Sequence, residues 1–233
     1  MASAPTPTAL IVGASRGLGL ALAEEYLKRG WQVIATVRGH HPGQLHALAA
    51  KVGGRLEIEQ LDINSPAELE ALHQRLIGRR LDLLFVNAGV AIEAEKPIGE
   101  VSTDAFIDTM VTNALSPMRV VETLAPLVSA AGSIAAMSSG LGSVSGNVDG
   151  GWEAYRASKA ALNTLMRCFA ARHAGDTRSL LLMAPGWVRT DMGGPEAVLS
   201  VEESIPRVVD VIAAHAGHHG LRFLDYRGDT VPW

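Results

Sequence analysis

The sequence has a single cysteine, Cys168, among its 233 residues. One cysteine excludes a disulfide within the chain and favours a reducing compartment. The first eight residues are small and include two prolines, without the charged start and the apolar run of a signal peptide. The apolar stretches are too short to span a bilayer. We therefore expect a cytoplasmic protein whose residues 1–7 form a flexible N-terminus.

The sequence also lacks a large excess of positive or negative residues. The 20 lysines and arginines stand against 24 aspartates and glutamates, which gives a net charge of −4, and the basic residues form no cluster. Nucleic acids and anionic membranes are therefore not expected as partners. The chain also lacks an internal repeat and a linker rich in proline, glycine and serine. Because 48% of the residues are hydrophobic, we expect one globular domain over residues 1–233.

Apolar runs alternate along the chain with stretches of helical spacing. Strands are predicted at 9–12, 31–37, 56–60, 81–86, 133–137, 178–183 and 221–224, and helices at 17–28, 44–51, from 65 onward, 103–128, 153–171 and 204–214. This order predicts an α/β fold, a single doubly wound Rossmann domain with a parallel sheet of about seven strands. Ligands of such folds bind beyond the carboxyl ends of the strands, where each motif below falls.

A glycine-rich turn directly follows the first strand and precedes a helix. It reads Gly13-Ala14-Ser15-Arg16-Gly17-Leu18-Gly19. Its glycines let the backbone approach a pyrophosphate, toward which the following helix points its N-terminus. The spacing differs from the commoner dinucleotide pattern Gly-x-Gly-x-x-Gly. A turn without a ligand is the alternative, but the position between a strand and a helix favours a nucleotide.

The end of the second strand indicates which dinucleotide binds. An NAD site usually has an acidic residue there, which accepts a hydrogen bond from the ribose. Here the strand ends in Ala35-Thr36-Val37-Arg38, without an acid. Arg38 and Arg16 suit a 2′-phosphate, because guanidinium groups bind phosphate through a planar fork. The sequence thus favours NADP(H) over NAD(H); in the alternative, both arginines are solvated surface charges.

Tyr155 and Lys159 lie near the start of the long helix and share one of its faces. A lysine ammonium favours the phenolate of a neighbouring tyrosine, whose ordinary pKa is ~10, and so eases proton exchange. The fifth strand ends at Ser138-Ser139, where a hydroxyl can donate to a substrate carbonyl oxygen beside Tyr155. The alternatives are an ordinary helix surface and serines that only solvate a loop.

Asn113 lies four residues before Pro117 in the predicted helix over 103–128. Proline has no N–H, so the carbonyl of Asn113 loses its helical partner and we expect a kink. The freed carbonyl can hold a water that connects the Lys159 ammonium to bulk solvent. A purely structural kink is the alternative.

Together these motifs resemble the short-chain dehydrogenase/reductase family, and the resemblance covers nearly the whole chain. The matching residues are Gly13, Gly17, Gly19, Asp62, Asn87-Ala88-Gly89, Asn113, Ser139, Tyr155, Lys159 and Pro185-Gly186. Within the family, the chain looks like the C-factor-like or sniffer-like carbonyl reductase branch. This narrower resemblance depends on Met137 to Ser143, Gly150-Gly151, Tyr155 to Asn163 and the ending Val231-Pro232-Trp233.

The resemblance implies four catalytic residues. Tyr155 would be the acid and base, Ser139 would orient the carbonyl, Lys159 would bind the nicotinamide ribose, and Asn113 would anchor the water relay. Among the cofactor residues, Asp62 and Ile63 would hold the adenine. The implied cofactor-binding residues are Gly13, Ser15, Arg16, Gly17, Leu18, Gly19, Arg38, Asp62, Ile63, Asn87, Ala88, Gly89, Tyr155, Lys159, Pro185, Gly186, Val188 and Thr190.

The chain departs from the family pattern at two places. Val86 stands where the family more often has an asparagine, and we expect only local repacking from it. The gap between Ser139 and Tyr155 is a few residues longer than the commonest spacing. Ser138 and Ser143 are therefore rivals for the catalytic serine, and we retain Ser139 as the second serine of the pair at the strand end.

Residues 187–203 are expected to cover the substrate, with Met192-Gly193-Gly194-Pro195 as the hinge of a small lid. The apolar candidates for the substrate pocket, some of which are core residues in the alternative, are Val90, Leu141, Val144, Trp152, Trp187 and Met192. They favour a ketone or aldehyde with a hydrophobic body. The histidines at 40–41 and 215–219 lack a recognised ligand pattern, so no metal is expected.

The sequence therefore predicts an NADPH-dependent carbonyl reductase that also oxidises alcohols in reverse. One alternative is a non-catalytic, NADP-binding signalling or regulatory protein. Another is a sugar-nucleotide epimerase, which the glycine spacing and the short C-terminal region disfavour. In the family that the chain resembles, the helices at 113–128 and 153–171 commonly form a dimer face, so we expect a homodimer or homotetramer.

Overall fold

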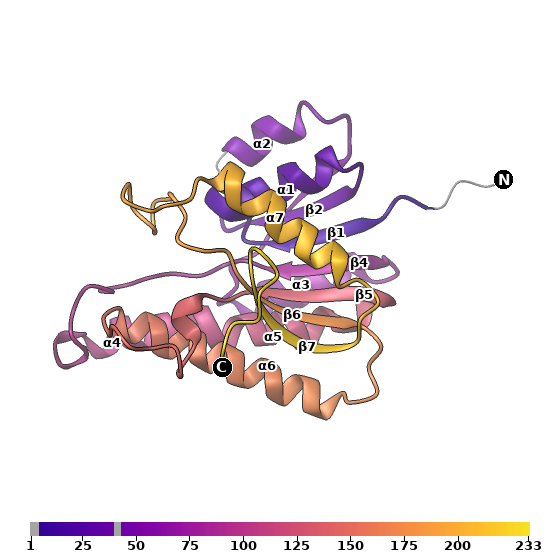
Figure 1. Ribbon diagram of the computed structural model, residues 1–233. Helices are drawn as coiled ribbons and strands as arrows, with labels where there is room; N and C mark the ends of the chain where they lie inside the picture. Colours follow the sequence, from indigo (N-terminus) through magenta and orange to yellow (C-terminus); the bar gives the residue numbers. More distant parts are fainter. Residues whose placement is uncertain (1–4, 40–42) are drawn as a thin grey trace.

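The computed structural model describes residues 5–39 and 43–233. Within these ranges the chain builds one parallel sheet of seven strands, in the order β3-β2-β1-β4-β5-β6-β7 (Figure 1). The strands are β1 (Thr8–Val12), β2 (Gln32–Val37), β3 (Leu56–Gln60), β4 (Leu81–Val86), β5 (Val128–Met137), β6 (Ser179–Ala184) and β7 (Gly220–Asp225). The predicted α/β fold is confirmed. The predicted flexible N-terminus falls in part on residues 1–4, and the pair His40-His41 falls on 40–42; both segments lie outside the described residues.

Helices cover both faces of the sheet (Figure 1). One face carries α1 (Gly17–Lys28), α2 (Gln44–Ala49) and α7 (Val201–Ala214), and the other carries α3 (Pro66–Leu76), α5 (Ser116–Leu124) and α6 (Glu153–Arg172). Successive side chains of a strand point to opposite faces. Leu84 therefore packs with Leu162 of α6, whereas its neighbour Phe85 packs with Val208 of α7 in a separate cluster.

The stretch predicted as one helix over 103–128 consists of several elements. They are α4 (Thr103–Met110), a π-helical turn (Val111–Leu115), α5 and a 3₁₀ turn (Ala125–Leu127). Within the π turn, the N–H of Ser116 donates to the carbonyl of Val111. Since Pro117 has no N–H, regular α-helical hydrogen bonding cannot pass through Asn113. The regular α-helix is therefore interrupted by a π turn at the place where the kink was expected.

Two elements begin earlier in the structure than the sequence predicted. β5 begins at Val128 instead of 133, and its pairing with β4 shifts register between Leu81 and Leu83. The helix predicted from 204 begins at Val201, because Ser200 and Glu203 form a reciprocal capping box. The Ser200 hydroxyl accepts from the Glu203 N–H at 3.1 Å, and the Ser200 N–H donates to the Glu203 carboxylate at 2.7 Å.

The strand order places a crevice at the carboxyl ends of β1 and β4. These two strands are neighbours, but the chain leaves β1 toward β2 and leaves β4 toward β5, on opposite sides. Such a switch point is the usual ligand site of doubly wound folds. Among the described residues, no helix is both long enough and apolar enough to span a membrane.

Candidate functional site

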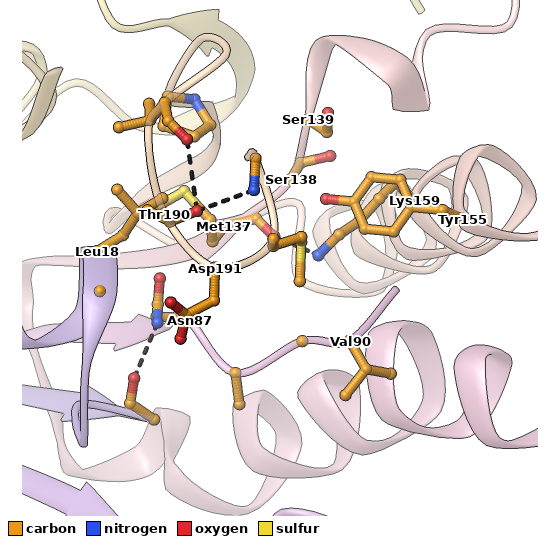
Figure 2. Close-up of a pocket in the computed structure, with 18 of the residues that line it drawn as sticks. Leu18, Asn87, Val90, Met137, Ser138, Ser139, Tyr155, Lys159, Thr190 and Asp191 are labelled. Carbon is orange, nitrogen blue, oxygen red and sulfur yellow. Dashed lines mark hydrogen bonds between the residues drawn. The ribbon is translucent and has the colours of Figure 1, made fainter. Parts of the chain in front are cut away.

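A cavity of about 1130 Å³ opens at this switch point. Most of the predicted cofactor residues line it, and so do Ser139, Tyr155 and Lys159. Figure 2 shows Leu18, Asn87 and Asp191 toward one side of the cavity and Tyr155, Lys159 and Ser139 toward the other. The structure thus brings the predicted nucleotide loop and the predicted proton-transfer groups into one space.

In the glycine loop, Gly13 and Gly19 have no room for a side chain. Gly13 has a φ of +87°, and a Cβ there would fall 2.8 Å from the backbone nitrogen of Ala88. The Asn87 amide donates to the carbonyl of Gly13 at 2.8 Å, which fixes the loop against the end of β4 (Figure 2). Gly19 does not line the cavity, and a Cβ there would fall 2.0 Å from the carbonyl oxygen of Gly13, so close packing of the loop requires a glycine at this position. A direct contact of Gly19 with the cofactor stays a prediction.

Arg16 and Arg38 line the same cavity from the loops after β1 and β2. Arg16 also forms an ion pair with Asp191, a residue that the sequence did not single out. Both side chains of this pair are mostly exposed, so the pair adds little stability. Guanidinium groups that line a cavity suit a phosphate ester, and within the described residues Arg38 forms no ion pair with Asp191, which is the partner of Arg16.

The adenine end predicted from Asp62 and Ile63 is present in the cavity lining. One oxygen of the Asp62 carboxylate accepts a hydrogen bond from the Asn64 N–H at 2.9 Å. The other oxygen accepts none from the described residues. Asn64 was not predicted. Its side chain donates to Thr112 at 2.8 Å and accepts from Ser116 at 2.8 Å, which ties this loop to the π turn.

Tyr155 and Lys159 project from α6 into the cavity, and the Lys159 Nζ lies 5.7 Å from the centre of the Tyr155 ring. Burial raises the pKa of Tyr155 to about 12, although the hydroxyl of Ser139, hydrogen-bonded to Tyr155, acts in the opposite direction. Burial lowers the pKa of Lys159 to about 8. Desolvation of the phenolate dominates, so the net shift of the Tyr155 pKa is opposite to the lowering expected from a lysine neighbour.

The three rival serines have different surroundings. Ser138 also lines the cavity, but it is buried and its hydroxyl donates to Asn163 at 2.7 Å. Ser143 is buried outside the cavity lining and accepts from the Gly146 N–H at 2.9 Å. Ser139 lines the cavity and accepts from the Leu141 N–H at 3.1 Å. A hydroxyl that accepts one hydrogen bond keeps its own proton for donation. Ser139 is therefore the serine whose donor faces Tyr155.

Asn113 is fully buried and does not line the cavity. Its side-chain amide accepts from the N–H of Val90 at 2.7 Å and donates to the carbonyl of Val90 at 2.7 Å and to Ser158 at 2.9 Å. Gly89 lies between Asn113 and Lys159, since a Cβ there would be 3.2 Å from the Asn113 Oδ1 and 3.4 Å from the Lys159 Nζ. The side chain of Asn113 thus fixes one wall of the cavity, and its carbonyl as a water anchor stays a prediction.

The predicted nicotinamide residues Pro185, Gly186, Val188 and Thr190 all line the cavity. Gly186 has a φ of +85°, and a Cβ there would fall 2.5 Å from Leu199. The hydroxyl of Ser204 donates to the carbonyl of Pro185 at 2.7 Å, which connects this turn to α7.

Five of the six predicted substrate residues line the cavity, namely Val90, Leu141, Trp152, Trp187 and Met192. The sixth, Val144, is 72% exposed and lies outside the cavity lining, so its contact with a substrate stays a prediction. Val144 follows the 3₁₀ turn Gly140–Gly142 and points to solvent, beyond the wall that Leu141 forms. Trp152 has a left-handed backbone, and its ring meets the Tyr155 ring edge to face, with 5.6 Å between ring centres.

The two ends of the loop over 187–199 are held together by backbone contacts. Val188 pairs with Leu199, and the Trp187 carbonyl accepts from the Leu199 N–H at 3.1 Å. The predicted hinge at 192–195 therefore lies near the tip of this loop. The role of the segment as a lid stays a prediction.

The chain matches a family model described as short chain dehydrogenase over residues 7–197. The chain belongs to the short-chain dehydrogenase/reductase family. It is 39% identical to the C-signal protein of Myxococcus xanthus over 155 residues, 66% of this chain and 93% of that protein. This match agrees with the predicted C-factor-like branch.

Two solved structures of the short-chain dehydrogenase/reductase family resemble the chain over 98% of its length and over 100% of theirs. One, from Burkholderia multivorans, is described as a short-chain dehydrogenase/reductase with bound NADP, with 59% sequence identity and a TM-score of 0.97. The other is a carbonyl reductase from Pseudomonas aeruginosa PAO1 in complex with NADP, with 40% identity and a TM-score of 0.91.

Several further residues of this short-chain dehydrogenase/reductase line the cavity without having been predicted. They include Asn64, Glu95, Arg156, Asp191, Tyr226 and Val231. Tyr226 directly follows β7, so the rule that ligands bind beyond the strand ends could have found it. Glu95 and Asp191 lie in loops without a recognisable motif, so the sequence did not indicate that they face the cavity.

Proposed function

We propose that the protein is an NADP(H)-dependent carbonyl reductase that acts on ketones or aldehydes with a hydrophobic body and oxidises alcohols in reverse. The observation that carries the proposal is the convergence of two sets of residues on one cavity. One set is the glycine loop with Arg16 and Arg38, and the other is Tyr155, Ser139 and Lys159. Neither set alone distinguishes a reductase from a nucleotide-binding protein.

The cavity fits NADP(H) on its own geometry. Gly13 and Gly186 line the cavity in turns of positive φ, where a Cβ would collide with Ala88 and with Leu199. The guanidinium groups of Arg16 and Arg38 line the same cavity. Arg38 and Arg16 would hold the 2′-phosphate, and Asp62 the adenine amino group. The NADP-bound relatives support this assignment. When bound, the cofactor supplies the hydride.

Tyr155 would donate the proton to the carbonyl oxygen. With a pKa near 12, its phenol is fully protonated at neutral pH, which is the form that reduction requires. Ser139 would donate a second hydrogen bond to the same oxygen, so that two donors meet the charge that develops there. Both groups would act on the carbonyl oxygen. Tyr155 would have to recover its proton before the next turnover, whereas Ser139 would keep its own.

Lys159 would bind the nicotinamide ribose and return the proton. Its Nζ donates to the Met137 carbonyl at 2.9 Å, which leaves two of its three donors for other partners. With a pKa near 8, the ammonium is mostly charged at neutral pH. The carbonyl of Asn113 would anchor the water that reloads this proton.

One observation favours a second candidate, a non-catalytic NADP-binding signalling protein. The relative at 39% identity is named C-signal. The two candidates differ in turnover, because only the reductase requires the phenol of Tyr155 to react.

The test follows NADPH and NADH oxidation at the nicotinamide absorbance with a panel of aromatic ketones, diketones and aldehydes. Tyr155→Phe is expected to lower kcat by ~10²–10⁴-fold while NADPH still binds, as for loss of a general acid. Tyr26→Phe is the matched control, because this buried tyrosine lies on α1 outside the cavity lining.

Arg38→Asp is expected to shift the preference from NADPH toward NADH, because a carboxylate repels the 2′-phosphate and accepts from a ribose hydroxyl. Saturable NADPH binding without turnover on any compound would support the signalling candidate. A fully active Tyr155→Phe would overturn the proposed mechanism.

A further inference from the structure

A buried amide ties the loop that carries Ser139 to the helix that carries Tyr155. Asn163 lies on α6 four residues after Lys159 and therefore on the face that Tyr155 and Lys159 share. Its side chain is 4% exposed. The amide oxygen accepts from the Ser138 hydroxyl at 2.7 Å, and the amide nitrogen donates to the Gly142 carbonyl at 3.2 Å.

Ser139 lies between these two attachment points. Before it, the Ser138 N–H donates to the Met183 carbonyl at 2.8 Å, which is the last hydrogen bond of β5 to its neighbour strand. After it, the Gly142 N–H donates to the Ser139 carbonyl at 2.8 Å and closes a 3₁₀ turn. The residues 138–142 are therefore held at both ends by one side chain.

The loop also lies directly against the helix. A Cβ at Gly142 would be 3.0 Å from the Cβ of Lys159 and 3.1 Å from the amide nitrogen of Asn163. The separation between the Ser139 turn and α6 is thus fixed by backbone contact as well as by the amide. A side chain without hydrogen-bonding groups at 163 would leave the Ser138 hydroxyl and the Gly142 carbonyl without these buried partners.

We propose that Asn163 is a positioning residue that holds the Ser139 hydroxyl against Tyr155. Hydrogen bonds to a reacting oxygen weaken steeply with distance and angle, so a small drift of the 138–142 turn separates the two donors. The inference deepens the proposed function and rests on it. It also explains why Ser138, although adjacent, is unable to replace Ser139, since the Ser138 proton is already given to Asn163.

The first test compares kcat and the NADPH Kd of Asn163→Leu, Ser138→Ala and the double variant. Each single variant is expected to lower kcat by roughly tenfold with the NADPH Kd within about twofold. The double variant is expected to have a kcat within about threefold of that of the less active single variant, because Asn163→Leu alone already breaks the hydrogen bond that Ser138→Ala removes. Ser179→Ala is the matched control, a fully buried serine at the opposite end of the adjacent strand β6, and its kcat is expected to stay at the wild-type value.

An unchanged kcat in Asn163→Leu, single losses that multiply in the double variant, or a loss confined to the NADPH Kd would each overturn the inference. Ser138→Ala keeps the test available if Asn163→Leu fails to fold, because it retains the hydrogen bond from the amide to Gly142.

The second test does not depend on turnover. In crystal structures of wild type and Ser138→Ala, the Ser139 hydroxyl is expected to withdraw from the Tyr155 hydroxyl in the variant while the sheet and α6 superpose. An unmoved Ser139 would overturn the positioning role. A withdrawn Ser139 in a protein whose wild type reduces no carbonyl would support the positioning role and count against the proposed function instead.

Discussion

At the scale of single residues, burial sets the chemistry of the proton-transfer pair. It raises the pKa of Tyr155 to about 12 and lowers that of Lys159 to about 8, because it disfavours the charged form of each. The phenol is therefore kept as an acid, and the ammonium is kept close to its point of neutralisation. The lysine is the group whose charge changes within the working range of pH.

This asymmetry predicts how carbonyl reduction depends on pH. The Lys159 ammonium is present below its pKa of about 8 and is lost above it, so kcat is expected to fall as pH rises through that value. Tyr155 contributes no fall there, because its pKa lies near 12. The measurement is kcat at saturating NADPH across the pH range.

Lys159→Arg is the matched variant, because a guanidinium stays protonated with a pKa above ~12. Its residual activity is expected to lose the alkaline fall. A wild-type rate that does not change with pH, or an identical fall in Lys159→Arg, would contradict the assignment.

The motif residues were predictable from the sequence because each carries a local physical requirement. Gly13 needs a positive φ, and Tyr155 and Lys159 need one helix face. Val144 and Gly19, in contrast, lie outside the cavity lining. Leu18 and Leu141 line the cavity close by in the sequence, but whether a given residue faces the cavity depends on loop geometry that no spacing records.

At the scale of elements, capping side chains decide where the functional loops end. The helix predicted from 65 onward is α3, which begins at Pro66 with Ser65 as its cap; the Ser65 hydroxyl accepts from the Glu68 N–H at 3.2 Å. The sequence analysis missed Ser200 at α7, although Glu203 follows it at the spacing of a capping box. The division of the 103–128 stretch could be predicted at Pro117 but not as a π turn, because hydrogen-bond registers differ by small energies.

Ser200→Ala is expected to lower the free energy of unfolding by about 1 kcal/mol, as for loss of an N-cap. It is also expected to raise the KM for the carbonyl substrate, because α7 begins where the loop over 187–199 ends. Urea unfolding and steady-state kinetics measure the two effects.

Ser65→Ala removes a cap of the same kind from α3 and is the matched control, with a similar loss of stability and an unchanged substrate KM. Equal substrate KM values for Ser200→Ala and wild type would contradict a role of the loop over 187–199 in substrate binding.

At the scale of the whole molecule, alternating apolar strands and helices were enough to predict the layers. Two apolar clusters fill the spaces on the two faces of the sheet, as the doubly wound prediction requires. The sequence does not encode in any local pattern which loops meet above the strand ends. That is why the sequence did not predict that Tyr226 and Asn64, which are far apart in the chain, both line the cavity.

The homodimer or homotetramer expected from the sequence stays a prediction, and the structure suggests how to test it. Leu115 in the π turn and Leu165 on α6 are large apolar residues exposed on the two helical segments expected to form the dimer face. Light scattering after size exclusion is expected to give at least a dimer for wild type and a smaller mass for Leu115→Asp combined with Leu165→Asp. A monomeric wild type would contradict the prediction.

The central claim is that this cavity transfers a hydride to a carbonyl carbon while Tyr155 protonates the oxygen. Its most direct test is reduction of an active ketone or aldehyde with NADPH deuterated at nicotinamide C4, followed by mass spectrometry of the alcohol. The account predicts one deuterium on the carbinol carbon with wild type and a greatly reduced yield with Tyr155→Phe at equal NADPH occupancy. An alcohol without deuterium from both C4-deuterated epimers of NADPH, or an equal yield from Tyr155→Phe, would contradict it.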